Sequence, residues 1–475
     1  MVSNDNLTEW SARDVLSAFR AKSLSPVEYL EVLIEQIVLW QPRINALGDT
    51  YFDDALLEAK RAAEVYSGSG HKARPLEGIP IVVKDETEIA GRRTTNGSLL
   101  WADYVSEESD PIVERLIEAG AIIHARGLTP EFSVPFWTHS RMWGATRNPW
   151  NLDYDVGGSS GGSAAALAAG MTPLATGSDI GGSIRVPASC CGVVGFMPPS
   201  GRIAVPGPWG RDDWSHVGPM ARTVADTALV ADLVSGHHVR DHFSLRERMQ
   251  IGTPRADVRG MRVAFSEDLG DWPVTEEVRA AARSTAQTLR DLGATVESVD
   301  LTITRDEVRR ASNAHNASLF AASLRIQIEG VEDQVNPYVL AWLDELDDDQ
   351  TPTSTFEGRE MEAAISERVD RVLSDYEVLL CPAMSMPAFA AGVDYTQEKF
   401  FLDGVERDSF HDLHLTEVFN IAGRCPVLAI PAGRSADGVP IGMQIVGPTY
   451  RDDVVMRVGA ALEAAAPWPV TVPTP

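Results

Sequence analysis

Gly157-Gly158-Ser159-Ser160-Gly161-Gly162-Ser163 is followed, after a short interval, by Asp179-Ile180-Gly181-Gly182-Ser183-Ile184-Arg185. Each stretch places a serine among glycine pairs. Glycine reaches positive φ without a steric clash and lets another group approach the main chain closely. A serine held in this way lies exposed beside free backbone N–H groups, which can bind a developing oxyanion. The pattern therefore indicates a serine nucleophile.

Glycine-serine runs are also typical of flexible linkers. Here, however, the first run is followed by an alanine-rich segment, 164–169, which predicts a helix ending at Gly170. A short apolar strand is then expected from residue 172, ending at Asp179. A linker is not expected between packed elements, so the two serine stretches are interpreted as parts of one site.

A serine hydroxyl is a weak nucleophile until a base takes its proton. The lysines are Lys22, Lys60, Lys72, Lys84 and Lys399, and Lys84 alone ends an apolar strand, at residues 78–84. Burial disfavours the ammonium and lowers the lysine pKa, as a lysine base requires. The alternative is a strand-end lysine paired with Asp85 or Glu86.

These features together resemble the amidase signature family. The resemblance is most specific from about residue 75 to 195 and looser to 226, and it reappears between 419 and 444. It implies an α/β fold, a single large domain with a central mixed β-sheet surrounded by helices. We expect one amidase domain over 1–475, with a signature core at about 75–226 and a variable, substrate-facing region at about 235–410.

The resemblance also implies the catalytic roles. Ser183 is expected to be the nucleophile, and Ser159, preceded by a cis peptide bond, to relay its proton to neutral Lys84. The expected oxyanion hole consists of the backbone amides of Ile180, Gly181, Gly182 and Ser183. Asp179 and Arg185 are interpreted as supports of this loop, and no cofactor is expected.

The composition excludes some partners. The net charge is −27 and the isoelectric point is about 4.7, so the protein repels phosphate backbones and anionic lipid heads, and neither nucleic acid nor a membrane is expected as a partner. The N-terminus lacks the basic and apolar segments of a signal peptide, which predicts a cytoplasmic protein. A homodimer is compatible with the composition but is not predicted by it.

Histidines and cysteines raise the question of a metal. Neither the group His237, His238 and His242 nor the pair His411 and His414 shows a convincing ligand pattern, so no metal is expected and both groups are interpreted as surface or packing side chains. The four cysteines are expected to be buried thiols: Cys190, Cys191, Cys381 and Cys425.

Four aromatic side chains are candidates for substrate binding. Trp209 and Trp214 lie on a Pro/Gly-rich segment, 201–214, which predicts a loop, and Phe136 and Trp137 lie upstream. They are expected either to line an apolar pocket or to pack in the core.

The same 201–214 segment departs from the pattern of glutamyl-tRNA amidotransferase subunits. The predicted activity is therefore hydrolysis of a small, neutral, rather hydrophobic amide such as an aryl acylamide, with esters and carbamates (urethanes) as further substrates. The alternatives are an amidotransferase subunit of that type and a catalytically silent binding subunit, which would be expected to lack Lys84, Ser159 or Ser183.

Overall fold

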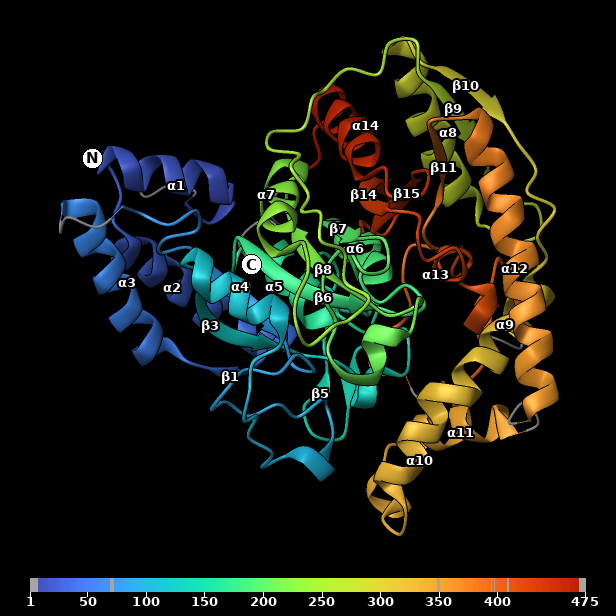
Figure 1. Cartoon of the computed structure of the whole chain (residues 1–475), viewed down its shortest axis with the longest axis horizontal. Coiled ribbons are helices and arrows are strands. Elements are labelled where there is room, and N and C mark those ends of the chain that lie inside the picture. The colour runs from blue at the N-terminus through green and yellow to red at the C-terminus, as the bar shows by residue number, and fades with distance from the viewer. Residues whose placement is uncertain are drawn as a thin grey trace.

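The computed structural model describes residues 7–68, 72–347, 351–393, 395–396, 398–407 and 410–469. Its centre is a mixed sheet of 11 strands in the order β1-β3-β2-β6-β8-β7-β14-β15-β11-β9-β10, with helices around it (Figure 1). Strand β2 runs parallel to β3 and β6, and β9 runs parallel to β10 and β11. The remaining pairs are antiparallel. The single domain with a mixed sheet that the sequence predicts is confirmed.

The strands of this sheet are β1 (Leu47–Thr50), β2 (Pro80–Lys84), β3 (Ile122–Gly127), β6 (Leu174–Asp179), β7 (Val194–Met197), β8 (His216–Ala221), β9 (Arg262–Phe265), β10 (Thr295–Ser298), β11 (Val378–Pro382), β14 (Val427–Arg434) and β15 (Pro440–Val446). Two small hairpins are β4 (His139–Ser140) with β5 (Gly144–Ala145), and β12 (Phe400–Leu402) with β13 (Val405–Arg407). The α-helices are α1 (Ala12–Ala21), α2 (Pro26–Ile44), α3 (Phe52–Ser67), α4 (Pro111–Ala119), α5 (Gly161–Ala168), α6 (Arg185–Cys191), α7 (Val224–Val234), α8 (Glu276–Asp291), α9 (Arg305–Asn316), α10 (Ala322–Ile328), α11 (Pro337–Glu345), α12 (Pro352–Asp375), α13 (Glu417–Ile421) and α14 (Asp452–Ala465).

The alternation of side chains along β2 decides which layer each residue meets. Ile81 and Val83 pack with residues of α1, α2, α4 and α7, whereas Val82 packs against the alanines of α5. Because successive strand residues point to opposite faces, Lys84 shares the face of Val82. The sheet therefore directs the lysine toward the helix that follows the first serine stretch.

The C-terminal half of the sheet is covered by two further layers. Helices α7, α8 and α14 pack on one face, and α9, α12 and α13 pack on the other. In Figure 1, α10 and α11 lie at the lower right, beyond the end of α9. A short π-helical segment, Ala317–Ala321, connects α9 to α10.

Two local expectations show how sequence specifies structure here. The strand predicted to end at Asp179 is β6, and it does end there. The segment 201–214 is largely irregular, but a 3₁₀ helix forms within it at Gly207–Arg211, because Pro208 has the fixed φ that suits the start of a helical turn.

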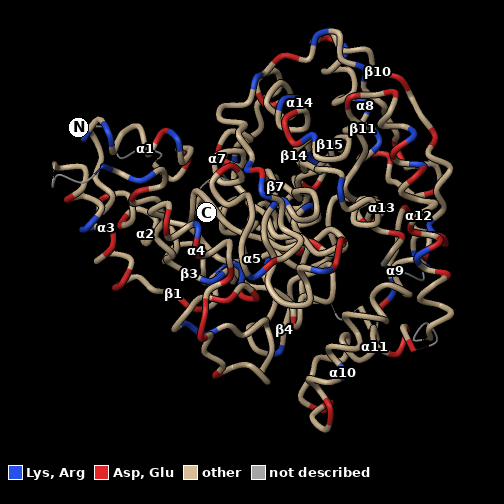
Figure 2. The backbone as a smooth tube through the Cα atoms, viewed as in Figure 1, with Lys and Arg blue, Asp and Glu red and all other residues tan. Residues whose placement is uncertain are grey.

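Charged residues occur throughout the outer helices. Figure 2 shows acidic and basic residues interspersed along the helices at both ends of the sheet, while the centre around α5 carries few of them. Among the described residues, no helix combines the length and the apolar character needed to cross a membrane.

Candidate active site

Lys84 lies buried at the end of β2, where its amine meets three oxygen atoms. Its Nζ is 2.7 Å from Ser159 Oγ, 2.8 Å from Ser178 Oγ and 3.1 Å from Glu86 Oε2. Burial lowers the pKa of Lys84, and the nearby Glu86 carboxylate only partly opposes that shift. The lysine is therefore both paired with Glu86, as the alternative interpretation required, and in contact with a serine of the glycine-rich stretch.

Ser159 follows a cis peptide bond from Gly158, as the resemblance implied. Ser160 connects the two serine stretches, because its backbone N–H donates to the Ser183 carbonyl at 3.1 Å. Ser160 occupies the N-cap position of α5, but its hydroxyl donates to the Ser178 carbonyl at 3.3 Å and does not cap the helix.

The turn that carries Ser183 connects β6 to α6 and is held by a buried ion pair. Asp179 accepts from the Ile184 N–H at 3.0 Å and pairs with Arg185 at 2.8 Å. Arg185 also donates to Asn420 and Gln444, at 2.6 and 2.8 Å. Burial raises the pKa of Asp179, but Arg185 and the neutral donors outweigh it and hold that pKa below its usual value. These contacts agree with the interpretation of Asp179 and Arg185 as loop supports.

The backbone of this turn presents donors. Within the described part of the chain, none of the N–H groups of Ile180, Gly181, Gly182 and Ser183 is paired with another protein group. The Thr416 hydroxyl donates to the Gly181 carbonyl at 2.5 Å and so holds that peptide. Gly182 has a φ of +140°, and a Cβ there would lie 2.1 Å from Thr416 Oγ1, so glycine is required.

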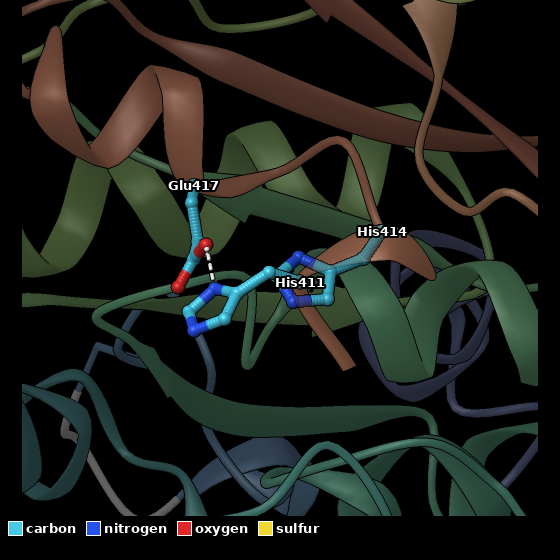
Figure 3. A group of neighbouring side chains, drawn as sticks. All are labelled: His411, His414 and Glu417. Carbon is cyan, nitrogen blue, oxygen red and sulfur yellow. Dashed lines mark hydrogen bonds and ion pairs between the residues drawn. The ribbon is translucent and has the colours of Figure 1, made fainter. Parts of the chain in front are cut away.

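Two histidines and a glutamate lie together (Figure 3), and Glu417 is next to the same turn, because a Cβ at Gly181 would lie 3.6 Å from its side chain. His411 Nδ1 contacts Glu417 Oε2 at 2.7 Å, and His414 Nδ1 contacts Thr416 Oγ1 at 3.0 Å. Among the described residues, His411, His414 and Glu417 form the one group with metal-ligand geometry, their ligand atoms all lying within 4.8 Å.

The charges of this group differ. Burial lowers the pKa of His411, but the Glu417 carboxylate more than offsets this and raises it overall, whereas burial lowers the pKa of His414 to about 4. His411 and Glu417 thus form an ion pair beside a neutral His414. His414 Nδ1 thus contacts the Thr416 hydroxyl that holds the turn, and Glu417 also accepts a hydrogen bond from the Ser312 hydroxyl at 3.0 Å.

Both candidate serines line one cavity of about 410 Å³. Ser159 and Ser183 share its wall with Ser178 and Glu86, and Lys84 lies buried behind Ser159. Ser183 is only 4% exposed, so a substrate reaches it through this cavity. The apolar part of the wall is formed by these side chains: Trp101, Phe132, Val205, Trp209, Val217, Phe320 and Leu324.

The four aromatic candidates are separated by the tertiary structure. Trp209 lines the cavity and packs edge-on against Phe320, with ring centroids 5.5 Å apart. Trp214 is 1% exposed and stacks on His315, with ring centroids 4.1 Å apart. Phe136 is buried against His414 and Trp137 against Tyr338, so these two and Trp214 pack in the core, the second of the two alternatives, and only Trp209 of the four is among the residues that line the cavity.

The comparisons with known proteins agree with this geometry. The family model described as Amidase matches residues 28–456. An acylamidase of Rhodococcus erythropolis is 32% identical over 98% of both chains. The chain belongs to the amidase signature family. Like other members of this family, it is an amide-bond hydrolase.

Two further relatives indicate the breadth of the family. A glutamyl-tRNA(Gln) amidotransferase subunit from Deinococcus deserti is 33% identical, over 85% of this chain and 86% of its own. The solved structure of a bacterial aryl acylamidase superposes with a TM-score of 0.90 at 28% identity, covering 97% of this chain and 96% of its own.

Two residues of the site, Ser178 and Thr416, were not predicted from sequence, whereas Glu86 was named there as a possible partner of Lys84. Ser178 is the last residue but one of β6, and its alternation with Asp179 along that strand is the signal that points it toward Lys84. Thr416 has no local signal, because its role depends on a contact with Gly181 across 235 residues.

Proposed function

We propose that this protein hydrolyses a neutral, rather hydrophobic amide, with aryl acylamides as the first substrate class and esters and carbamates as further ones. The observation that carries the proposal is that Ser159 and Ser183 line one largely apolar cavity and that the buried Lys84 contacts Ser159. The names of the acylamidase relatives support the substrate class.

In the proposed mechanism, the Ser183 hydroxyl attacks the substrate carbonyl carbon. Its proton passes to Ser159 Oγ while the Ser159 proton passes to Lys84 Nζ, which is 2.7 Å away. The backbone N–H groups of 180–183, which have no partner among the described residues, bind the oxyanion of the tetrahedral intermediate. Collapse breaks the C–N bond, the amine takes the proton back through Ser159, and the acyl group remains on Ser183 until water releases it.

The cavity wall favours an aryl or alkyl group over a small polar one. Trp209 and Phe320 come from separate segments and meet edge-on above an apolar wall. Contact with such a wall contributes about 25 cal/mol for each Å² of apolar surface removed from water, so a larger apolar substrate gains more binding energy.

A second candidate is the ammonia-releasing reaction of a glutamyl-tRNA amidotransferase. The 33% identity to the amidotransferase relative from Deinococcus deserti favours it. Lys84 contacts Ser159, and Ser159 and Ser183 line the same cavity. The presence of all three residues argues against a catalytically silent binding protein.

The test is turnover of purified protein on a panel of aryl anilides, short aliphatic amides, aryl carbamates, aryl esters and glutamine. The proposal requires the highest kcat/KM on an aryl anilide, and a preference for glutamine would refute it. The mechanism uses no metal, so the same rates are expected after dialysis against EDTA. Loss of activity that added zinc restores would assign a role to His411, His414 and Glu417.

A further inference from the structure

Glu86 places a carboxylate directly on the proposed base. Its Oε2 lies 3.1 Å from Lys84 Nζ, with the lysine side chain fully buried and the glutamate side chain 19% exposed. The Ser133 hydroxyl donates to the same Oε2 at 2.5 Å, which fixes the carboxylate in place. Glu86 also lines the cavity beside Ser159, Ser178 and Ser183.

Two other carboxylates near Lys84, Asp179 and Asp85, are paired with arginines. Asp179 is paired with Arg185 through both of its oxygens, at 2.8 and 3.0 Å. Asp85 turns away to Arg126, at 3.3 Å, and to Thr95. Asp110, farther along the cavity wall, lies 3.9 Å from Arg240. Glu86 is the described carboxylate within ion-pair distance of Lys84.

When Lys84 accepts the proton, its neutral side-chain amine becomes an ammonium. Because this group is buried, forming the charge costs free energy unless a negative group lies beside it. A carboxylate at ion-pair distance stabilises the charge as it forms, as the aspartate of a Ser-His-Asp triad stabilises its imidazolium. We propose that Glu86 is a positioning residue whose carboxylate stabilises the Lys84 ammonium during acyl transfer and thereby sets the strength of the base. The proton remains on Lys84 Nζ until Ser159 returns it to the leaving amine; it never passes to Glu86, which remains ionised throughout.

This inference rests on the proposed function in taking Lys84 as the base, but it does not depend on the substrate. Glu86 favours the ammonium in the free enzyme as well, and the Glu86→Gln variant should therefore have a Lys84 of lower pKa that is a weaker base. An opposite charge at this distance shifts a pKa by about one unit or more. The pH at which activity rises should fall by that amount, and the plateau rate should also fall.

The experiment measures the rate at which a fluorophosphonate labels Ser183 as a function of pH, in the wild type, Glu86→Gln, Glu86→Asp and Glu108→Gln. In Glu86→Gln the midpoint of the rise should move down by about one pH unit or more and the plateau should drop at least about threefold. Glu86→Asp should lie between the wild type and Glu86→Gln. Glu108 is exposed, and Glu108→Gln removes the same charge outside the cavity, so its profile should match the wild type.

An unchanged midpoint in Glu86→Gln with a lower rate would reduce Glu86 to a packing role and overturn the inference, and a higher plateau would overturn it as well. Should Glu86→Gln fail to fold, Ser133→Ala removes the hydrogen bond that holds Glu86, and a smaller shift in the same direction is expected. The two proposals can also fail separately. If the midpoint of labelling shifts in Glu86→Gln but the wild type does not turn over aryl anilides, the proposed substrate is refuted and the role of Glu86 is retained.

Discussion

The Nζ atom of Lys84 lies 2.7 Å from the Ser159 hydroxyl oxygen, although 75 residues separate the two in the chain. The lysine thus contacts the serine of the first glycine-rich stretch, while Ser183 lines the same cavity as that serine, and its carbonyl accepts from the Ser160 N–H. The proposed roles of Lys84 as base and of Ser159 as proton relay predict different consequences for the loss of each side chain.

Ser183→Ala should abolish turnover and all covalent labelling, because the acyl group has no other attachment site. Ser159→Ala should lose most turnover, by about 10²-fold or more, but keep slow labelling at Ser183, since it loses proton transfer and not the nucleophile. Mass spectrometry of the labelled peptide checks both. A label on Ser159 or Ser160 in the wild type would contradict these roles.

Lys84→Arg should be nearly as inactive as Lys84→Ala, because a guanidinium keeps its proton at every working pH. In the wild type, kcat/KM should rise with pH as the ammonium loses its proton and should then level off. The profile is measured on an aryl anilide, with melting temperatures as a control for folding. An Arg variant with most of the wild-type kcat/KM would show that Lys84 is not the base.

Trp209→Ala should lower kcat/KM for an aryl anilide by about 5- to 30-fold and leave acetamide nearly unaffected, because about 1–2 kcal/mol of apolar contact is lost only by a large substrate. The matched control is Trp214→Ala, which removes a core side chain. That variant should lose about 3–5 kcal/mol of unfolding free energy. Equal losses on both substrates in Trp209→Ala would show that the ring is not part of the pocket.

His315 predicts a pH dependence of stability. Its ring lies between Asp212, 2.9 Å from Nε2, and Glu362, 3.2 Å from Nδ1. Burial lowers the pKa of His315, but the two carboxylates outweigh it and raise the pKa from 6.5 to about 9. A raised histidine pKa contributes stability that is complete below pH 6.5 and lost as the pH rises through about 9.

Chemical denaturation of the wild type and His315→Gln between pH 6 and 10 measures this effect. The difference in unfolding free energy between the two proteins should shrink toward high pH, by on the order of 3 kcal/mol. A difference that is constant over this range would show that the histidine is neutral in the folded protein.

Several elements could be predicted from sequence because their causes are local. The strand before Lys84 is a run of β-branched apolar residues, and β2 forms there. Ser25 and Glu28 form the capping box that begins α2. The turn of Ser183 lies between β6 and α6, where the glycine pair predicts a sharp change of direction.

The placement of the aromatic side chains could not be predicted in this way. Trp209 and Trp214 are five positions apart in one segment with the same composition, yet one lines the cavity and the other is buried against His315. The difference arises because α9, which carries His315, packs against Trp214 across about a hundred residues of chain. Hydrophobicity favours burial of both rings but does not say against which surface.

The sequence by itself determined the family, the mixed α/β architecture and the residue types of the site, since glycine-rich turns and a lysine-ended apolar strand follow from local sterics and burial. Only the tertiary structure decided which distant groups meet: Thr416 with Gly181, Arg185 with Asn420, and Arg185 with Gln444. The physical reason is that hydrogen bonds act over a few ångströms, and these three contacts join groups more than 200 residues apart.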